Sequence, residues 1–489
     1  MVFRNGFWSM MLILCLGAAV TGCNRLRVSR ENHPCSPLQF GLKEAKTAIE
    51  RYYVLQRTHE EASRRGANVS YAGIKEITIE IPSKAKSIPL THHTDFANVV
   101  LKVKNNQKDL YLFSLADKLT PVNVKGREID NGIFSKHQTL RLGRKLLVVS
   151  DKTPWVEKRT GYDYGATRKD IMLLENGVSG NGPVQSYSTL ASIPEGQYRE
   201  VEDSKIVIKN ITFQRLGGST KKTYLIKAEN QYDLELTGIT ISTPNSSDFY
   251  GDRAIYLINC YKVQMNDVSI NGTYSLEKRF GYGVCLDNVY DFQVNNMYAR
   301  ANWGVFGTNN VNNAHLTNCD INRFDVHCYG KDIIFDHCNF VDLYNQFASV
   351  YGMITFTNCT FTNFTPVLVG SSYNAYTACD ILFDKCTFNL DKKHPSIVDF
   401  SGFEKKENER PELKEKCLPN VSIQDCQVNL TGDVKKWCVY NTKKMGDYEG
   451  TFSHVSKVTV RGLKNERMNS MEVFTKKINS KNKVQIIEE

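Results

Sequence analysis

A short pattern of apolar residues recurs along the second half of the chain, and it limits the fold to a stack of similar units. In its clearest copy, from Ile206 to Phe213, apolar residues stand at the first, third, sixth and eighth positions. Further copies begin at Leu234, Val263, Phe292, Ala314, Ile333, Ile354, Ile381 and Val421, with a degenerate last copy at Val458. One such unit cannot bury its own core, so neighbouring copies must stack on one another.

The spacing within each copy predicts two short strands joined by a corner. Residues two apart lie on the same face of a strand, and the single step of three marks a change of direction. The corner usually ends in Asn, Gly or Asp, as at Asn210 and Gly238, and these residues tolerate the left-handed backbone of a tight turn. Helical periodicity would place apolar residues at the fourth and fifth positions, which are polar here. We therefore predict an all-β solenoid of about ten coils.

These repeats resemble those of the pectin-lyase-like superfamily, over roughly residues 200–465. The resemblance implies a right-handed parallel β-helix. The superfamily includes lyases, hydrolases, esterases, adhesins and phage spikes, so it implies a fold and not one activity. The chain has neither the Gly-His-Gly nor the Arg-Ile-Lys motif of the polygalacturonate hydrolases. It also has no clear aspartate cluster of the calcium-dependent lyase type, so no cofactor is predicted and Ca²⁺ has no support in the sequence.

The beginning of the chain has the pattern of an export signal. Arg4 is followed by an apolar run, Phe7 to Val20, which is too short to span a bilayer. The run leads into Val20-Thr21-Gly22-Cys23, which resembles a bacterial lipobox. The resemblance implies lipidation of Cys23 and an outer-membrane lipoprotein of the Bacteroidetes type, attached to the membrane by lipid alone. An ordinary signal peptide is the alternative. The residues after Cys23 lack the acidic residues usual in surface-exported members, so the membrane face stays open.

The remaining segments complete the predicted organisation. Residues 1–22 form the signal, 23–39 a tether, 40–70 an N-terminal helix that caps the open core, 71–467 the β-helix and 468–489 a polar tail. Alternating apolar and polar residues over 74–155 favour the first, irregular coils. We expect a monomer.

Five cysteines occupy one position of the repeat and predict a row of packed thiols: Cys319, Cys338, Cys359, Cys386 and Cys426. Buried free cysteine behaves as a small apolar residue. A metal site is not predicted, because the chain has no pair of cysteines separated by two residues.

A second strand before each copy predicts the richest polar patch of the chain. Its residues predicted to face outward are Tyr256, Cys285, Phe306, His327 and Tyr351. Asp325 and His327 stand two apart and therefore share a face. The candidate catalytic residues are Asp325, His327 and Asp287, and the candidate substrate-binding residues are Arg323, Arg300, Tyr329, Tyr351, Trp303, Tyr282 and Arg279. Aromatic rings there could stack on sugar rings, and arginines could hold a carboxylate or sulfate.

Two reactions fit this patch. In β-elimination from a uronate, Arg300 or Arg323 would neutralise the carboxylate, and His327 or Tyr351 would act as base or acid. In hydrolysis, two carboxylates flank the bond, and Asp287 and Asp325 would be the pair, two coils or roughly 9.6 Å apart. The alternative without a function is that the same residues form only a hydrogen-bonded ladder on the surface.

Three functions remain open on the sequence alone. The first is a polysaccharide lyase or glycoside hydrolase of the cell envelope that acts on an acidic or complex glycan. The second is a non-catalytic glycan-binding or adhesin-like lipoprotein, and the third is a structural role. The net charge of +10 fits acidic partners without selecting one. Nucleic-acid binding is not expected, because the basic residues are scattered and the chain is exported.

Overall fold

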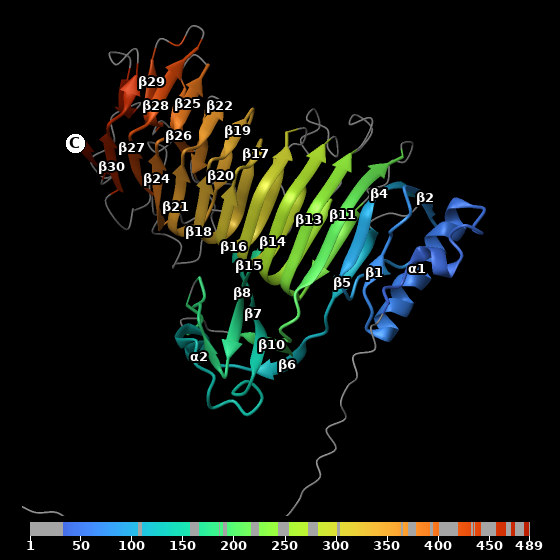
Figure 1. Cartoon of the computed structure of the whole chain (residues 1–489). Coiled ribbons are helices and arrows are strands. Elements are labelled where there is room, and N and C mark those ends of the chain that lie inside the picture. The colour runs from blue at the N-terminus through green and yellow to red at the C-terminus, as the bar shows by residue number, and fades with distance from the viewer. Residues whose placement is uncertain are drawn as a thin grey trace, which may run out of the picture.

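The structure, a computed structural model, describes residues 33–488 apart from 106–109, 157–165, 185, 189–192, 217–223, 243–253, 272–281, 301–303, 363–364, 370–377, 392–394, 401–418, 432–433, 435, 442–455, 466–470 and 475–483. Most of it is a rod of stacked parallel strands, with a smaller antiparallel sheet on one side (Figure 1). Cys23 lies outside the described residues. No helix in the described part is long and apolar enough to cross a membrane.

The longest ladder of the rod contains the repeat, and its strands pair in the predicted register. Ile206 lies opposite Leu234, which lies opposite Val263, and the series continues through all ten copies to Val458. The strands are β4 (Thr94–Asn105), β11 (Ile206–Arg215), β13 (Tyr232–Ser242), β14 (Ile255–Asn271), β15 (Tyr282–Ala299), β16 (Gly304–Thr317), β18 (Phe324–Asp336), β21 (Val350–Thr357), β24 (Ala378–Asp384), β27 (Asn420–Gln424), β30 (Ser456–Arg461) and β33 (Val484–Glu488).

Two further ladders complete each coil. One consists of β17 (Asp320–Ile321), β19 (Asn339–Val341), β22 (Thr360–Thr362), β25 (Thr387–Leu390), β28 (Gln427–Leu430) and β31 (Lys464–Asn465). The other runs through β3 (Ile88–Pro89), β5 (Tyr111–Ala116), β12 (Tyr224–Glu229), the first parts of β14, β15, β16 and β18, and then β20 (Asn345–Phe347), β23 (Val367–Val369), β26 (Ser396–Phe400), β29 (Trp437–Asn441) and β32 (Met471–Phe474). β32 and β33 pair with the rod, so the predicted polar tail is partly strand.

The corners have the predicted backbone. All ten predicted corner residues have positive φ, between 51° at Asp425 and 64° at Gly462. They are Asn210, Gly238, Asp267, Asn296, Asn318, His337, Asn358, Lys385, Asp425 and Gly462. The five cysteines of the repeat are buried and free, as predicted. The core of the rod is thus one continuous column of apolar side chains.

A helix closes the N-terminal end of this column. It is α1 (Ala48–Arg65), preceded by the 3-10 helix η1 (Pro37–Phe40) and followed by β1 (Val69–Ser70) and β2 (Glu76–Ile81). The side chain of Thr47 accepts a hydrogen bond from the backbone of Glu50 and begins the helix, and Gly66 ends it with a left-handed backbone. Tyr52 and Leu55 join the core of the rod, so α1 caps the stack as predicted.

Residues 120–200 differ from the prediction. They form a five-stranded antiparallel sheet in the order β6-β10-β7-β8-β9, with a short helix, and we call this segment the insertion. Its elements are β6 (Thr120–Asn123), α2 (Gly126–Asn131), β7 (Arg144–Val156), β8 (Ala166–Glu175), β9 (Val178–Ser179) and β10 (Glu195–Glu200). It has its own core, around Phe134, Leu147 and Met172. Alternation of apolar and polar residues was interpreted as irregular coils, but it fits an antiparallel sheet equally well.

Candidate functional site

The predicted patch lies on the outer face of β15, β16 and β18, but its alignment needs one correction. Asp325 lies opposite Gly307, which lies opposite Cys285, so Asp325 and not His327 occupies the outward row. Phe306, predicted to face outward, lies opposite Val284 and is fully buried in the core of the rod. The predicted alignment is already one residue off between β15 and β16, because Val284 lies opposite Phe306 and not Val305.

Two glycines of β16 make a seat for the Tyr282 ring. A Cβ atom added at Gly307 would lie 2.5 Å from Cγ of Tyr282, and one added at Gly304 would lie 2.8 Å from its Cε1. Real Cβ atoms do not come that close, so these positions require glycine for the ring to lie where it does. Because Gly304 and Gly307 have no side chain, Tyr282 of β15 can reach across β16 to β18.

The Tyr282 hydroxyl joins Asp325 and His327. It donates to Oδ2 of Asp325 at 2.7 Å and lies 2.8 Å from Nε2 of His327. On the other side of the carboxylate, Nε of Arg323 donates to Oδ1 of Asp325. The structure therefore connects four predicted site residues in one network, which we call the Asp325 network: Tyr282, Arg323, Asp325 and His327.

The members of this network differ in their access to solvent. Asp325 has no exposed surface and Arg323 is 3% exposed. The side chain of His327 is 14% exposed and Tyr282 is half-buried. The Arg323 guanidinium also donates to Gln346 at 3.2 Å and lies 4.6 Å from the Tyr344 ring centroid. Asp325 and Arg323 are thus interior groups, and substrate could meet only the other two.

The charges of the network fix its protonation. Burial alone would raise the pKa of Asp325, but Arg323 and His327 together hold that pKa below its usual value. Burial and the negative charge of Asp325 raise the pKa of Tyr282 well above its usual value. Tyr282 therefore keeps its proton and donates it to the carboxylate, which is the stronger acceptor. Its oxygen can at the same time accept a hydrogen bond from Nε2–H of His327 at 2.8 Å.

His327 is the extra residue of a β-bulge. Thr308 lies opposite Val326 and Asn309 lies opposite Cys328, so His327 has no partner in the register between β16 and β18. Bulges redirect side chains and occur frequently beside active sites. Here the bulge turns the imidazole toward the Tyr282 hydroxyl.

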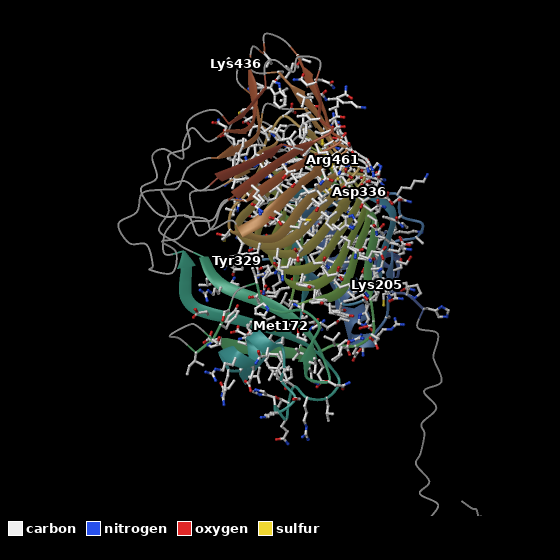
Figure 2. All side chains as sticks on the ribbon, turned by 90° about the vertical axis from the view of Figure 1, so that its left-hand side faces the viewer. Met172, Lys205, Tyr329, Asp336, Lys436 and Arg461 are labelled. Carbon is white, nitrogen blue, oxygen red and sulfur yellow. The ribbon has the colours of Figure 1, made fainter. Side chains whose placement is uncertain are left out.

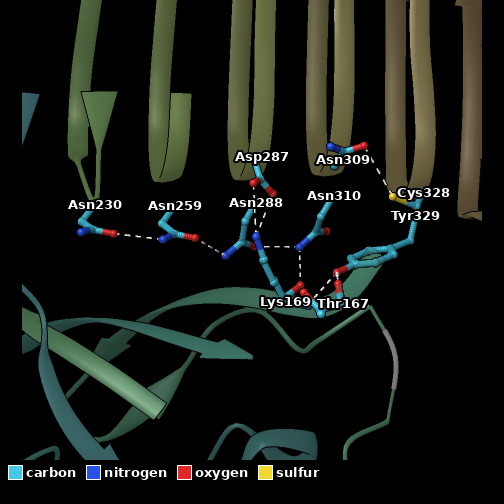
Figure 3. Close-up of polar contacts among 10 residues, drawn as sticks. All are labelled: Thr167, Lys169, Asn230, Asn259, Asp287, Asn288, Asn309, Asn310, Cys328 and Tyr329. Atoms are coloured by element: carbon cyan, nitrogen blue, oxygen red, sulfur yellow. Dashed lines mark hydrogen bonds and ion pairs between the residues drawn. The ribbon is translucent and has the colours of Figure 1, made fainter. Parts of the chain in front are cut away.

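Asp287 and Tyr329 hold the insertion instead of joining this network (Figure 3). Asp287 forms an ion pair with Lys169, in which Oδ2 lies 3.2 Å from Nζ. The Tyr329 hydroxyl donates to the carbonyl of Thr167 and accepts from the backbone N–H of Lys169, both at 2.6 Å. Figure 2 likewise places Tyr329 where rod and insertion meet. The predicted pairing of Asp287 with Asp325 is therefore not seen.

A row of asparagines ends at the same junction. Each donates to the one on the preceding coil, from Asn259 to Asn230 at 3.0 Å, then from Asn288 and from Asn310 in turn (Figure 3). Asn310 also donates to the carbonyl of Lys169. Because these amides satisfy one another at corners with positive φ, the row fixes the surface on which the insertion rests.

The other predicted residues lie elsewhere. Arg300 forms a two-pronged ion pair with Asp320, so its guanidinium is already balanced. Tyr351 lies opposite Lys331, beyond the turn at Tyr329 and off the row of Asp325. Arg279 and Trp303 lie outside the described residues. Within the described residues, no group of three or more His, Cys, Asp or Glu side chains could hold a metal ion.

Solved structures with the same architecture are found among phage tailspikes. The tailspike protein gp49 of Pseudomonas phage LKA1 superposes with a TM-score of 0.57 at 14% identity, over 88% of this chain and 80% of that one. The chain described here is a right-handed parallel β-helix. The Gp54 tailspike of Acinetobacter baumannii bacteriophage AP22, solved with a capsular saccharide, gives 0.50 at 12% identity, over 93% and 76%. The predicted fold is therefore confirmed. No family model and no curated protein matches the sequence of this β-helix.

The sequence interpretation missed three features of the site. The glycine seat had a signal, since Gly304 and Gly307 interrupt a strand at positions where other coils carry side chains. The bulge at His327 left no signal, because Phe324, Val326 and Cys328 keep the regular apolar alternation of an unbulged strand. The contact of β8 with Asp287 and Tyr329 joins segments more than a hundred residues apart and left none.

Proposed function

We propose that this β-helix is a polysaccharide lyase that acts on an acidic glycan, with His327 as the proton-transferring residue. The observation that carries the proposal is the Asp325 network, in which two sealed charged residues orient a half-buried Tyr282–His327 pair at the surface. A surface ladder needs no such internal support. General bases are commonly held by a hydrogen bond that fixes their tautomer.

The proposed chemistry uses the tautomer of His327 that carries its proton on Nε2 and its lone pair on Nδ1. Nδ1 of His327 takes the proton on the carbon next to the uronate carboxylate, the bond to the leaving oxygen breaks, and a carbon–carbon double bond forms. The imidazolium then returns the proton to the leaving oxygen. The cation that elimination requires is not Arg323 or Arg300, because both already hold carboxylates. We propose instead Arg279, a predicted substrate-binding residue that lies outside the described residues.

Hydrolysis fits the geometry less well. It requires two carboxylates on either side of the scissile bond. Asp325 has no exposed surface, and Asp287 is paired with Lys169 at the insertion. Neither acid is placed to touch a sugar, so the predicted hydrolytic pair is not supported.

The proposed location is the cell envelope. It rests on the lipobox at Cys23, with lipid as the membrane attachment and a monomeric rod. The saccharide bound by the Gp54 tailspike supports a glycan as the partner. The alternative function is non-catalytic glycan binding. It is favoured by the ion pairs that occupy both predicted catalytic acids.

One experiment separates these functions. Residues 24–489 are incubated with a panel of uronic and neutral polysaccharides, while ultraviolet absorbance of unsaturated products, reducing ends and glycan binding are all recorded. A lyase raises absorbance, and His327→Ala should lower kcat by about 10²- to 10⁴-fold. Tyr282→Phe should lower it less, since the ring stays in its seat.

His315→Ala is the matched control, because His315 is an exposed imidazole on the same strand as the glycine seat. It should leave the rate unchanged. Reducing ends without absorbance would refute elimination in favour of hydrolysis. Binding without any product, unchanged by His327→Ala, would establish the glycan-binding alternative.

A further inference from the structure

The insertion carries exposed aliphatic side chains around the turn that joins β8 to β9. Ile133 is 53% exposed, Leu142 65% and Val178 49%. None belongs to the core of the insertion, which is closed by other residues. They add little to that core, and exposed apolar groups of this size need another explanation when they cluster.

These three residues are neighbours. Ile133 and Val178 form an antiparallel bridge and so lie directly opposite each other. The segment that carries Leu142 packs on the same turn, because a Cβ atom added at Gly177 would lie 3.0 Å from Cα of Arg141. The backbone N–H of Asn176 also donates to Gly143 at 2.9 Å. We call Ile133, Leu142 and Val178 the aliphatic edge.

Two exposed basic residues flank the aliphatic edge. From Lys125 to Lys145 inclusive the chain has six basic and two acidic residues, but Arg144 pairs with Glu175 and Asp203, and Lys145 pairs with Glu200. Lys136 and Arg141 flank the edge and are exposed. One of the two acids, Glu128, is occupied by His137 at 3.0 Å. The edge thus combines apolar side chains with the two exposed cations Lys136 and Arg141.

We propose that the aliphatic edge docks on a membrane surface with anionic lipid headgroups. Aliphatic side chains enter the boundary between headgroups and acyl chains, and flanking lysines and arginines bind the anionic headgroups. Three side chains cannot supply the roughly 800 Å² per partner of a stable protein interface. The edge has no aromatic ring to stack on a sugar. A lipid surface is the partner that matches both its small apolar area and its charge.

Vesicle binding tests this surface. Residues 24–489, which retain every described residue and lack the predicted lipid site, are sedimented with phosphatidylcholine vesicles containing phosphatidylglycerol and with pure phosphatidylcholine vesicles. The protein should bind the anionic vesicles and lose affinity with added salt. Ile133→Asp combined with Leu142→Asp should weaken binding by at least about tenfold. Lys136→Glu combined with Arg141→Glu should weaken it by about 25-fold or more, since each basic residue near such a surface contributes about fivefold.

Ile334→Asp combined with Met353→Asp is the matched control, since these are exposed apolar residues of the rod. This variant should bind like the unmodified protein. Absence of binding to anionic vesicles overturns the proposal, and so does equal binding by the aliphatic-edge variant. Self-association without vesicles that the aliphatic-edge variant abolishes would assign the edge to a protein contact instead. Glycan cleavage does not enter these readouts, so the result is independent of the proposed lyase activity.

Discussion

Replacement of Asp325 by Asn should destabilise the central coils strongly. Asn keeps the shape of the side chain but removes its charge, and Arg323, only 3% exposed, then lies in the interior without a counter-charge. Removal of one partner from a buried ion pair costs roughly 3–5 kcal/mol. The Tyr282 hydroxyl also loses its charged acceptor. We therefore expect the free energy of unfolding of these coils to fall by at least about 3 kcal/mol.

Asp287→Asn provides the matched comparison. Asp287 also loses a cationic partner, Lys169 at 3.2 Å, but both side chains of this pair are partly exposed. Partly exposed ion pairs contribute about 0.2–1 kcal/mol. The two acids thus look alike in sequence, yet their replacement should differ in free energy by a factor of three or more.

Local unfolding is the suitable measurement, because stacked coils can open in parts. Hydrogen exchange of peptides from β16 and β18 gives the free energy of opening near each acid. The double variant Arg323→Met with Asp325→Leu should recover much of the loss, since an apolar pair of similar size avoids the uncompensated charge. Equal exchange in Asp325→Asn and Asp287→Asn would show that the Arg323–Asp325 pair is not sealed in the interior, and the reasoning would fail.

Three other results are expected. Burial raises the pKa of Asp170 from 3.8 to about 7, so the folded protein holds an extra proton between these values; stability should fall as pH rises from 4 to 7, and melting curves of Asp170→Asn should lack this dependence. Gly307→Ala should destabilise by about 1–3 kcal/mol in urea unfolding, and the effect should disappear when Tyr282 is also Ala, because the new methyl clashes with that ring. The buried cysteines of the repeat, such as Cys338, should react with a thiol reagent only as fast as the rod opens, as followed by mass spectrometry.

Most of the fold could be predicted because local sequence patterns determine it. The register of ten coils follows from apolar spacing within eight residues, and the left-handed corners follow from residue types such as Asn210 and Gly238. Each copy repeats the same information, so an error in one is corrected by its neighbours. The insertion lacks this redundancy. Its antiparallel pairing depends on contacts between distant segments, and its alternation alone matches either kind of sheet.

The site could be predicted in part. Tyr282, Arg323, Asp325 and His327 were selected as polar residues beside a strand of the rod, and the structure brings them together. Their order in space was not predictable, because a slip of one residue in the pairing of β15 with β16 exchanges the two faces of the strand. Nor does a sequence show which charges are sealed. Burial of Asp325 depends on a ring from another coil that lies over Gly307.

The insertion and the Asp325 network act on the same strand. A bulged residue has no partner in the ladder, so its direction is set by what holds the strand on either side. Before His327, Asp325 is fixed by Arg323. After it, Tyr329 is fixed by two backbone hydrogen bonds from β8 of the insertion. The insertion therefore holds the strand just beyond the bulge, although it contributes no side chain to the network. Tyr329 was predicted to bind substrate because of its polar neighbourhood, but its hydroxyl instead binds the backbone of the insertion.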